Sequence, residues 1–181
     1  MTHAATPQQL GKEGKTAYGR GDYLAAAQAF EAAQAGFKLT GATLEAAEMA
    51  NNCSVAYLQA EEAEKALQAV DGTEAIFAQA GDLRRQGMAL GNRGAALEAL
   101  DRKEEALQAY QQSADLLQEA GEDQMRVQVM QSLSMLQLNM GKQLQALASM
   151  QAGLDGVRRP TPKQSMLKKL LKIPFEMVNR K

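Results

Sequence analysis

Few side chains in this sequence have the types and spacing that catalysis or metal binding requires. The only histidine, His3, lies near the N-terminus, and neither a metal site nor a histidine base can be built from it. The single cysteine, Cys53, has no cationic neighbour in sequence to activate its thiol, so we expect a small buried side chain. The sequence also lacks a glycine-rich phosphate loop and an evident nucleophile–base pair. It therefore predicts a protein that is not an enzyme, with no catalytic residue, no metal and no cofactor.

The carboxylates and amides of this sequence suit helix stabilisation and hydrogen bonding rather than catalysis. The acidic runs at 61–64 and 104–105 fall where helices are expected to begin, and negative charge there favours the helix dipole. Asn52 and Asn92 lie 40 residues apart. Each amide can both donate and accept a hydrogen bond, so it can pair with a peptide group of any sequence. These asparagines therefore suit either hydrogen bonding to a peptide group or a place on a solvated helix face.

A 40-residue period underlies that spacing. Residues of similar size recur at four equivalent places along the chain. The recurring sets are Ala26, Ala66, Ala106 and Ala146; Phe30, Val70, Tyr110 and Met150; Phe37, Phe77, Leu117 and Val157; and the small residues Gly14, Ser54, Gly94 and Ser134. Periods of this length are typical of stacked arrays, in which each unit buries its apolar face against its neighbours. Such an array offers a long binding surface rather than a catalytic pocket.

Composition indicates that the array is built from helices. Ala, Leu, Gln and Glu dominate, and no proline occurs between Pro7 and Pro160, as continuous helices require. A chain of 181 residues is long enough for one domain. The sequence shows no secretory signal and no apolar run that could span a membrane, and its one cysteine cannot form an intrachain disulfide. We therefore expect a cytoplasmic protein.

The segment from Gly81 to Gly121 shows the expected unit. Asp82 follows a glycine and can cap the first helix, and Gly121 can end the second helix in a left-handed conformation. Between them, Gly94 supplies the small residue that two closely crossing helices need, and Tyr110 fills the space beside it. The unit is two antiparallel helices joined by a short turn.

This pattern resembles the tetratricopeptide repeat, in the longer 40-residue variety found in kinesin light chains and LGN-type scaffold proteins. The residues that carry the resemblance are Gly14, Tyr18, Gly21, Asp22, Tyr23, Ala26, Phe30 and Ala33, and again Gly94, Asp101, Ala106 and Tyr110. The resemblance implies an all-α, right-handed α-solenoid of four helical hairpins plus a C-terminal capping helix. We expect four repeats within residues 8–157, at about 8–40, 41–80, 81–120 and 121–157, followed by a basic tail at 158–181.

In the resembled family, the first helix of each hairpin lines a groove that receives an extended or helical peptide. The candidate groove residues here are Lys15, Tyr18, Asn51, Asn52, Val55, Leu58, Met88, Asn92, Glu98, Gln131, Met135 and Leu138. Asn52 and Asn92 are similar in position to family asparagines that hydrogen-bond a bound peptide. Val55 and Ala95 stand where polar clamp residues would be needed, so we do not expect binding of a chaperone's C-terminal carboxylate.

The C-terminal tail differs from the rest of the chain in charge. Residues 1–157 contain 12 Lys and Arg against 20 Asp and Glu, a net charge of −8, whereas residues 158–181 contain eight basic residues and one acidic residue, a net charge of +7. The second helix of the fourth repeat is expected to end near Leu154 or Gly156. A terminating helix should begin near Pro162 and stop or bend before Pro174. The tail interaction candidates are Leu167, Lys168, Lys169, Leu170, Leu171 and Lys172.

Three roles for the tail stay open. It caps the array, binds an anionic membrane surface, or occupies a groove of its own or of another copy. Nucleic-acid binding is not expected, because the acidic body repels phosphates. The sequence predicts a protein-interaction adaptor or scaffold whose partner is a protein or peptide. The alternative is a structural protein whose basic C-terminal helix mediates self-association or attachment to an anionic membrane surface.

Overall fold

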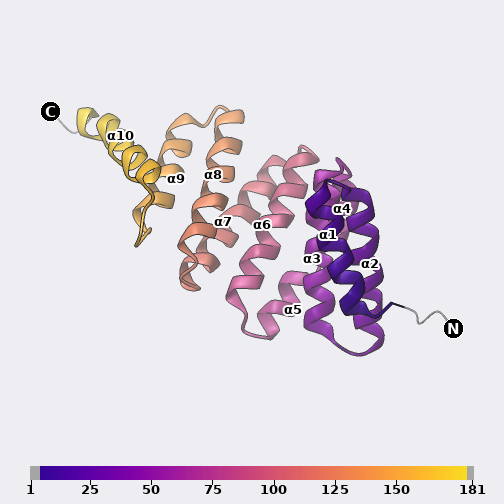
Figure 1. Cartoon of the computed structure of the whole chain (residues 1–181). Helices are drawn as coiled ribbons and strands as arrows, with labels where there is room; N and C mark the ends of the chain where they lie inside the picture. Colours follow the sequence, from indigo (N-terminus) through magenta and orange to yellow (C-terminus); the bar gives the residue numbers. More distant parts are fainter. Residues whose placement is uncertain (1–4, 179–181) are drawn as a thin grey trace.

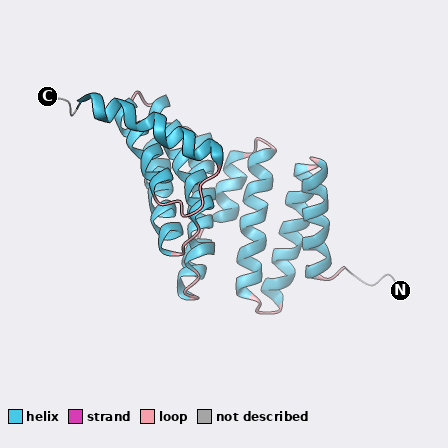
Figure 2. Cartoon of the chain, turned by 60° about the vertical axis from the view of Figure 1, so that its left-hand side comes forward, coloured by secondary structure: helices cyan, strands magenta, loops and turns pink. Residues whose placement is uncertain are grey.

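The computed structural model of this chain describes residues 5–178, with side chains described as far as Leu171. Within that range the chain forms helices joined by short turns and contains no strand (Figure 1, Figure 2). The helices are α1 (Pro7–Arg20), α2 (Tyr23–Leu39), α3 (Thr43–Gln59), α4 (Ala63–Val70), α5 (Thr73–Gln79), α6 (Leu83–Ala99), α7 (Lys103–Glu119), α8 (Asp123–Asn139), α9 (Gln143–Asp155) and α10 (Pro162–Val178).

Helices that follow one another in the chain pack side by side. The pairs α1–α2, α6–α7 and α8–α9 form antiparallel hairpins, and α3 forms the remaining hairpin with α4 and α5. Figure 1 shows these hairpins stacked in chain order, with α10 against α9 at the C-terminal end. The expected all-α solenoid of four hairpins with a terminal helix is confirmed.

The alanines that recur every 40 residues lie where the helices pack most closely. Ala26, Ala66 and Ala106 are fully buried, and Ala146 is 1% exposed. Ala66 shares one core cluster with residues of α2, α3 and α6, and Ala106 shares another with residues of α6 and α8. A methyl group at these positions lets neighbouring helix backbones approach closely, because protein interiors leave little empty space.

Glycine meets an aromatic ring at two helix crossings. A β-carbon on Gly14 would stand 2.7 Å from Cδ1 of Phe30, and one on Gly94 would stand 2.7 Å from Cδ1 of Tyr110. Carbon atoms in favourable contact are about 3.5–4.0 Å apart. Both glycines are therefore required by packing, as their fixed place in the period predicted.

The turns of the array use the left-handed backbone conformation. Gly41, Gly81 and Gly121 have φ values of +73°, +68° and +72°, which confirms their expected role after the second helices. Within the second and third hairpins the turn position is also left-handed, but Glu61 and Asp101 occupy it, with φ values of 61° and 58°. A side chain in this conformation carries a cost that glycine avoids.

The second helix of the second hairpin is broken, which the 40-residue period did not predict. Asp71 and Gly72 separate α4 from α5, and Gly72 has a φ of +71°. Across the break, the Thr73 hydroxyl donates to the carbonyl oxygen of Val70 at 2.7 Å. The equivalent helices α2 and α7 are continuous. Asp-Gly is a common turn dipeptide, and it supplies the local signal for this break.

Two expectations about the end of the array have different outcomes. The helix α9 ends at Asp155, as expected. The last helix was expected to stop or bend before Pro174, and it does not stop there, because the backbone of α10 continues to Val178; a bend at this point stays a prediction. Proline removes one helical N–H donor, and the hydrogen bonds on either side can still hold the backbone when the helix has nearly ended.

Candidate peptide-binding surface

Four of the expected groove residues gather around one hollow between α1 and α3. Lys15 and Tyr18 of α1 line it with Asn52 and Val55 of α3, and Phe30 of α2 completes the lining. The hollow has a volume of about 240 Å³. Its two aromatic rings and one valine can hold an apolar group, while an amide and an ammonium group lie beside them. This lining suits an apolar side chain whose own backbone or neighbour is polar.

Helical spacing brings these residues together. Lys15 and Tyr18 are three residues apart, as are Asn52 and Val55, so each pair lies on one side of its helix. Phe30 had been assigned to the core alone, and it is 3% exposed. Its ring reaches the hollow because the neighbouring position on α1 is glycine. The 40-residue register of small and large residues was the signal that could have placed this buried ring beside the hollow.

Asn51 does not lie on the exposed side of α3. Only 6% of it is exposed, and its side-chain oxygen accepts a hydrogen bond from Nδ2 of Asn92 at 3.4 Å. The expectation that Asn51 is exposed is therefore wrong, because α6 packs beside α3 at this point. Asn92 itself stays partly exposed. The bond joins the first helices of the second and third hairpins.

The remaining candidates lie further along the first helices. Met88 on α6 is 37% exposed, and on α8 Met135 is 55% exposed and Leu138 is 43% exposed. Gln131 is exposed on α8, whereas Leu58 is half-buried against the first core cluster. Three apolar side chains are thus accessible on α6 and α8.

Glu98 is held in place by Tyr110, a residue that the period assigned only to packing. The Tyr110 hydroxyl donates to Oε2 of Glu98 at 2.8 Å. Burial, followed by the charge and the hydrogen bond of Glu98, raises the pKa of Tyr110. A similar pair occurs where the Tyr57 hydroxyl donates to Oε1 of Glu31 at 2.8 Å, and burial again raises the pKa of Tyr57 most. Both hydroxyls remain protonated donors at neutral pH.

Cys53 is buried, as expected. It is 1% exposed, and its Sγ lies 3.5 Å from the carbonyl oxygen of Ala27. Burial, together with the charge of Glu31, raises the pKa of the Cys53 thiol to about 12. Because the thiolate is the nucleophilic form, the thiol is unreactive in the folded chain.

A larger hollow lies on the side of α6 that faces away from Met88 and Asn92. It is lined by residues of α5, α6 and α7, among them Leu90 and Arg93, and has a volume of about 590 Å³. At about 100° per residue, positions 90 and 93 point away from Met88 and Asn92. The two hollows therefore belong to different surfaces of the array.

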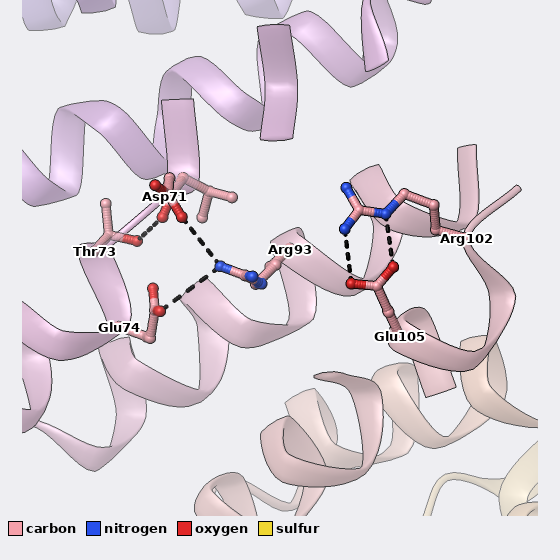
Figure 3. A network of polar contacts seen from close by, with 7 residues as sticks. Asp71, Thr73, Glu74, Arg93, Arg102 and Glu105 are labelled. Atoms are coloured by element: carbon pink, nitrogen blue, oxygen red, sulfur yellow. Dashed lines mark hydrogen bonds and ion pairs between the residues drawn. The ribbon is translucent and has the colours of Figure 1, made fainter. Parts of the chain in front are cut away.

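Three lining residues of the larger hollow, Glu74, Arg93 and Glu105, form the charged pairs drawn in Figure 3. Arg93 reaches the break between α4 and α5, where its Nη1 lies 3.2 Å from Oδ1 of Asp71 and 3.8 Å from Oε1 of Glu74. Arg102 donates twice to Glu105, at 2.7 Å each. The hydrogen bond from Arg102 is the main cause of the lowered pKa of Glu105. Both arginines are thus paired with carboxylates of the same chain.

The tail candidates divide between two sides of α10. Leu167 and Leu171 face a small core shared with α8 and α9. Lys168 pairs with Asp155 of α9 at 2.9 Å. The side chain of Lys172 lies outside the described part of the structure. The other two candidates are on the outer side of α10 and are considered below.

Within residues 5–178, no helix has the length and apolar character needed to cross a membrane. Among the described side chains, His, Cys, Asp and Glu form no group of three that could hold a metal ion.

Solved structures show what the chain resembles in three dimensions. No protein-family model and no curated protein matches it. It is similar to MamA, residues 41 to the end, from Desulfovibrio magneticus RS-1, with a TM-score of 0.61 and 21% identity over 82% of this chain and 74% of that one. It is also similar to nearly identical TPR-like repeats of a putative kinesin light chain from Podosopora anserina, with a TM-score of 0.53 and 13% identity over 100% of both chains. The fold is that of tetratricopeptide-like repeat proteins, which confirms the resemblance.

Proposed function

We propose that this chain is a protein-interaction scaffold that binds a peptide or helix along the exposed side of its first helices, α1, α3, α6 and α8. The hollow between α1 and α3 carries the proposal. Helical spacing and the family resemblance had placed Lys15, Tyr18, Asn52 and Val55 on a binding surface, and these four residues line one space. The fold supports the proposal, since stacked repeats provide extended binding surfaces.

The size of the hollow favours a peptide side chain over a small molecule. Small-molecule sites usually occupy about 300–1,000 Å³, and this hollow has a volume of about 240 Å³. An apolar side chain of the partner contacts Phe30 and Val55, while the Asn52 amide pairs with a peptide group beside it. The Lys15 ammonium group favours a partner with a carboxylate at this end of the surface.

Exposed apolar side chains extend the surface along the array. Met88 lies on α6, and Met135 and Leu138 lie on α8. Methionine adapts to partners of different shape, and apolar groups gathered on a surface mark interaction sites. When the partner binds, the Asn92 side chain gives up its hydrogen bond to Asn51 and forms one with the partner instead. We expect the partner to be an extended or helical segment with spaced apolar residues and an acidic residue near α1.

Peptide selection tests the proposal without a known partner. Peptides are selected from a random display library against the full chain, and the affinity of a selected peptide is measured by fluorescence anisotropy. The double variant Asn52→Ala, Val55→Asp should bind at least about tenfold more weakly, because it removes a hydrogen bond and places a charge in an apolar hollow.

The matched control makes the same kinds of change elsewhere. Gln28→Ala with Ala32→Asp alters exposed positions on α2 and leaves the hollow intact. Circular dichroism should show the same helicity for both double variants. Equal peptide affinity in the two would overturn the proposal.

A further inference from the structure

The last helix has an outer side that contacts nothing in the described part of the chain. One side of α10 packs on the array, but Met166 is 63% exposed and Leu170 is 52% exposed. Lys163 and Lys169 are also exposed on α10. Positions 163, 166 and 170 lie at helical spacing, so they share one side of the helix. That side combines apolar and cationic groups.

A capping box defines where α10 begins, and the Gln164 side chain also donates to Oε1 of Gln124 on α8 at 3.1 Å. The Thr161 hydroxyl accepts a hydrogen bond from the Gln164 amide N–H at 3.3 Å, and the Gln164 side chain accepts one from the Thr161 N–H at 2.8 Å. Just before the helix, the Arg158 side chain pairs with Asp123 at 3.2 Å. Figure 2 shows α10 lying across the end of the array. Its outer side is therefore presented to other molecules in a defined orientation.

Charge narrows the choice of partner for that side. Residues 158–181 have a net charge of +7, and residues 1–157 have a net charge of −8. Two α10 helices placed face to face would bring their lysines together, and like charges across an interface repel. The body of a second copy of this chain carries the opposite charge, so it is the complementary partner for this side of α10.

The larger hollow, between α5, α6 and α7, has the matching chemistry. Its apolar lining includes Leu90 and Leu97, which are 8% and 1% exposed, and the partly exposed Leu116. Among its carboxylates, Glu74 is paired with Arg93 and Glu105 with Arg102, whereas Asp115 is exposed and has no arginine or lysine partner among the described side chains. Asp115 contacts the neutral amide of Gln111 at 3.0 Å. Along α6 the lining runs from residue 86 to residue 97, about 16 Å of helix, which is longer than the roughly 10 Å between residues 163 and 170 of α10.

We propose that the outer side of α10 from one copy of this chain docks into the hollow between α5, α6 and α7 of a second copy. Met166 and Leu170 contact Leu116 and the exposed edge of Leu90, and Lys169 faces Asp115. Because the two surfaces differ, association is head-to-tail, and the rotation between successive copies decides whether they form a ring or an open chain. This interaction goes beyond the proposed function, since the hollow lies on the other side of α6 from the peptide-binding surface, and both can be occupied together.

Charge exchange between two variants tests the contact. Sedimentation velocity of the full chain over a range of concentrations measures self-association, which should weaken as salt is added. Lys169→Glu alone and Asp115→Lys alone should each weaken association by about tenfold or more. An equimolar mixture of the two variants should recover it, because each reversed charge then meets an opposite charge. The matched control Lys38→Glu, at an exposed site on α2, should associate like the unaltered chain.

Several results would overturn the proposal. The unaltered chain would sediment as a monomer at every concentration, or the two variants would associate normally, or their mixture would fail to recover association. Co-sedimentation of a monomeric chain with phosphatidylserine vesicles, lost in Lys169→Glu but kept in Asp115→Lys, would make an anionic membrane the partner of α10 instead. None of these results bears on peptide binding along the first helices.

Discussion

Gly94 of α6 lies directly against the ring of Tyr110 on α7, so that a β-carbon at position 94 would stand 2.7 Å from Cδ1 and 2.8 Å from Cε1 of the ring. The first hairpin repeats this relationship with Gly14 and Phe30. In the other two repeats the equivalent pairs are Ser54 with Val70, and Ser134 with Met150. Glycine thus accompanies an aromatic ring, and serine accompanies an aliphatic side chain.

Replacing Gly94 with alanine should destabilise the chain. Overpacking typically lowers the free energy of unfolding by about 1–3 kcal/mol. The better helix propensity of alanine raises it by at most about 1 kcal/mol. We expect a net loss of about 1–2 kcal/mol in the free energy of unfolding, measured by urea denaturation. Gly19→Ala is the matched control, because a β-carbon there meets nothing within 4 Å, and its stability should be unchanged or slightly higher.

Gly94→Ala should lower the free energy of unfolding much less when the Tyr110 ring is absent. In a double-mutant cycle with Tyr110→Val, the Gly94→Ala change no longer creates a clash, so the two effects should be strongly non-additive. Additive effects would show that the contact between position 94 and the ring does not govern stability.

Asp82 should stabilise the chain in a pH-dependent way. Its carboxylate caps α6 by accepting a hydrogen bond from the Arg85 N–H at 2.8 Å, and this bond is the main cause of the lowered pKa of Asp82. A lowered folded-state pKa means that the stabilisation is complete above the unfolded-state pKa of about 3.9 and is lost as the pH falls through the folded-state pKa. Asp82→Ala should therefore cost about 1 kcal/mol at pH 7, and the difference should shrink below about pH 4.

Asparagine provides the control for the Asp82 experiment. Asn caps helices about as well as Asp but does not titrate, so Asp82→Asn should retain most of the stability at pH 7 and lose little of it in acid. Thermal unfolding followed by circular dichroism across the pH range measures both variants. A pH-independent difference between the unaltered chain and Asp82→Ala would contradict the capping role of the carboxylate.

Glu61 offers a site at which glycine should increase stability. Its φ of 61° is left-handed, a conformation that destabilises a residue with a side chain by about 1–2 kcal/mol. Glycine avoids this strain, but its greater flexibility in the unfolded chain lowers the gain in stability by about 0.5–1 kcal/mol. Glu61→Gly should therefore raise the free energy of unfolding by roughly 0.5 kcal/mol. The reverse change, Gly141→Glu, at the equivalent turn with a φ of +73°, should lower it by a similar amount.

Cys53 should react with thiol reagents only when the chain unfolds. Its burial and its raised pKa of about 12 leave little accessible thiolate at neutral pH. Colorimetric thiol titration with increasing urea should follow the unfolding curve measured by circular dichroism. Rapid labelling of the folded chain would contradict the burial of Cys53 between α2 and α3.

The repeat was readable from sequence because packing constrains size at every crossing. The equivalent alanines and the helical glycines Gly14 and Gly94 face a neighbouring helix, whereas Gly41, Gly81 and Gly121 are favoured by their positive φ, so the period and the hairpins appear directly in the sequence. The break at Gly72 was not predicted, because the surrounding apolar residues Val70 and Phe77 keep the register of the continuous helices. A left-handed glycine changes the backbone locally without shifting the period.

The candidate site was predictable in position but not in detail. Lys15 and Asn52 belong to different repeats, and their meeting around one hollow depends on how α1 and α3 stack. Asn51 was misplaced because it lies at the middle of α3, where α6 packs beside that helix, and the sequence pattern alone does not show how far α6 covers it. The hydrogen bond from Tyr110 to Glu98 was missed because both residues had separate roles in the repeat pattern.

Peptide binding along the first helices is tested most directly by backbone NMR of the isotopically labelled full chain during titration with a selected peptide. We predict that the largest amide shift changes fall at residues 15–18 of α1 and 52–55 of α3, with smaller changes along α6 and α8. Shift changes confined to α2, α4 and α7, with residues 15–18 and 52–55 unmoved at saturation, would contradict binding on this surface.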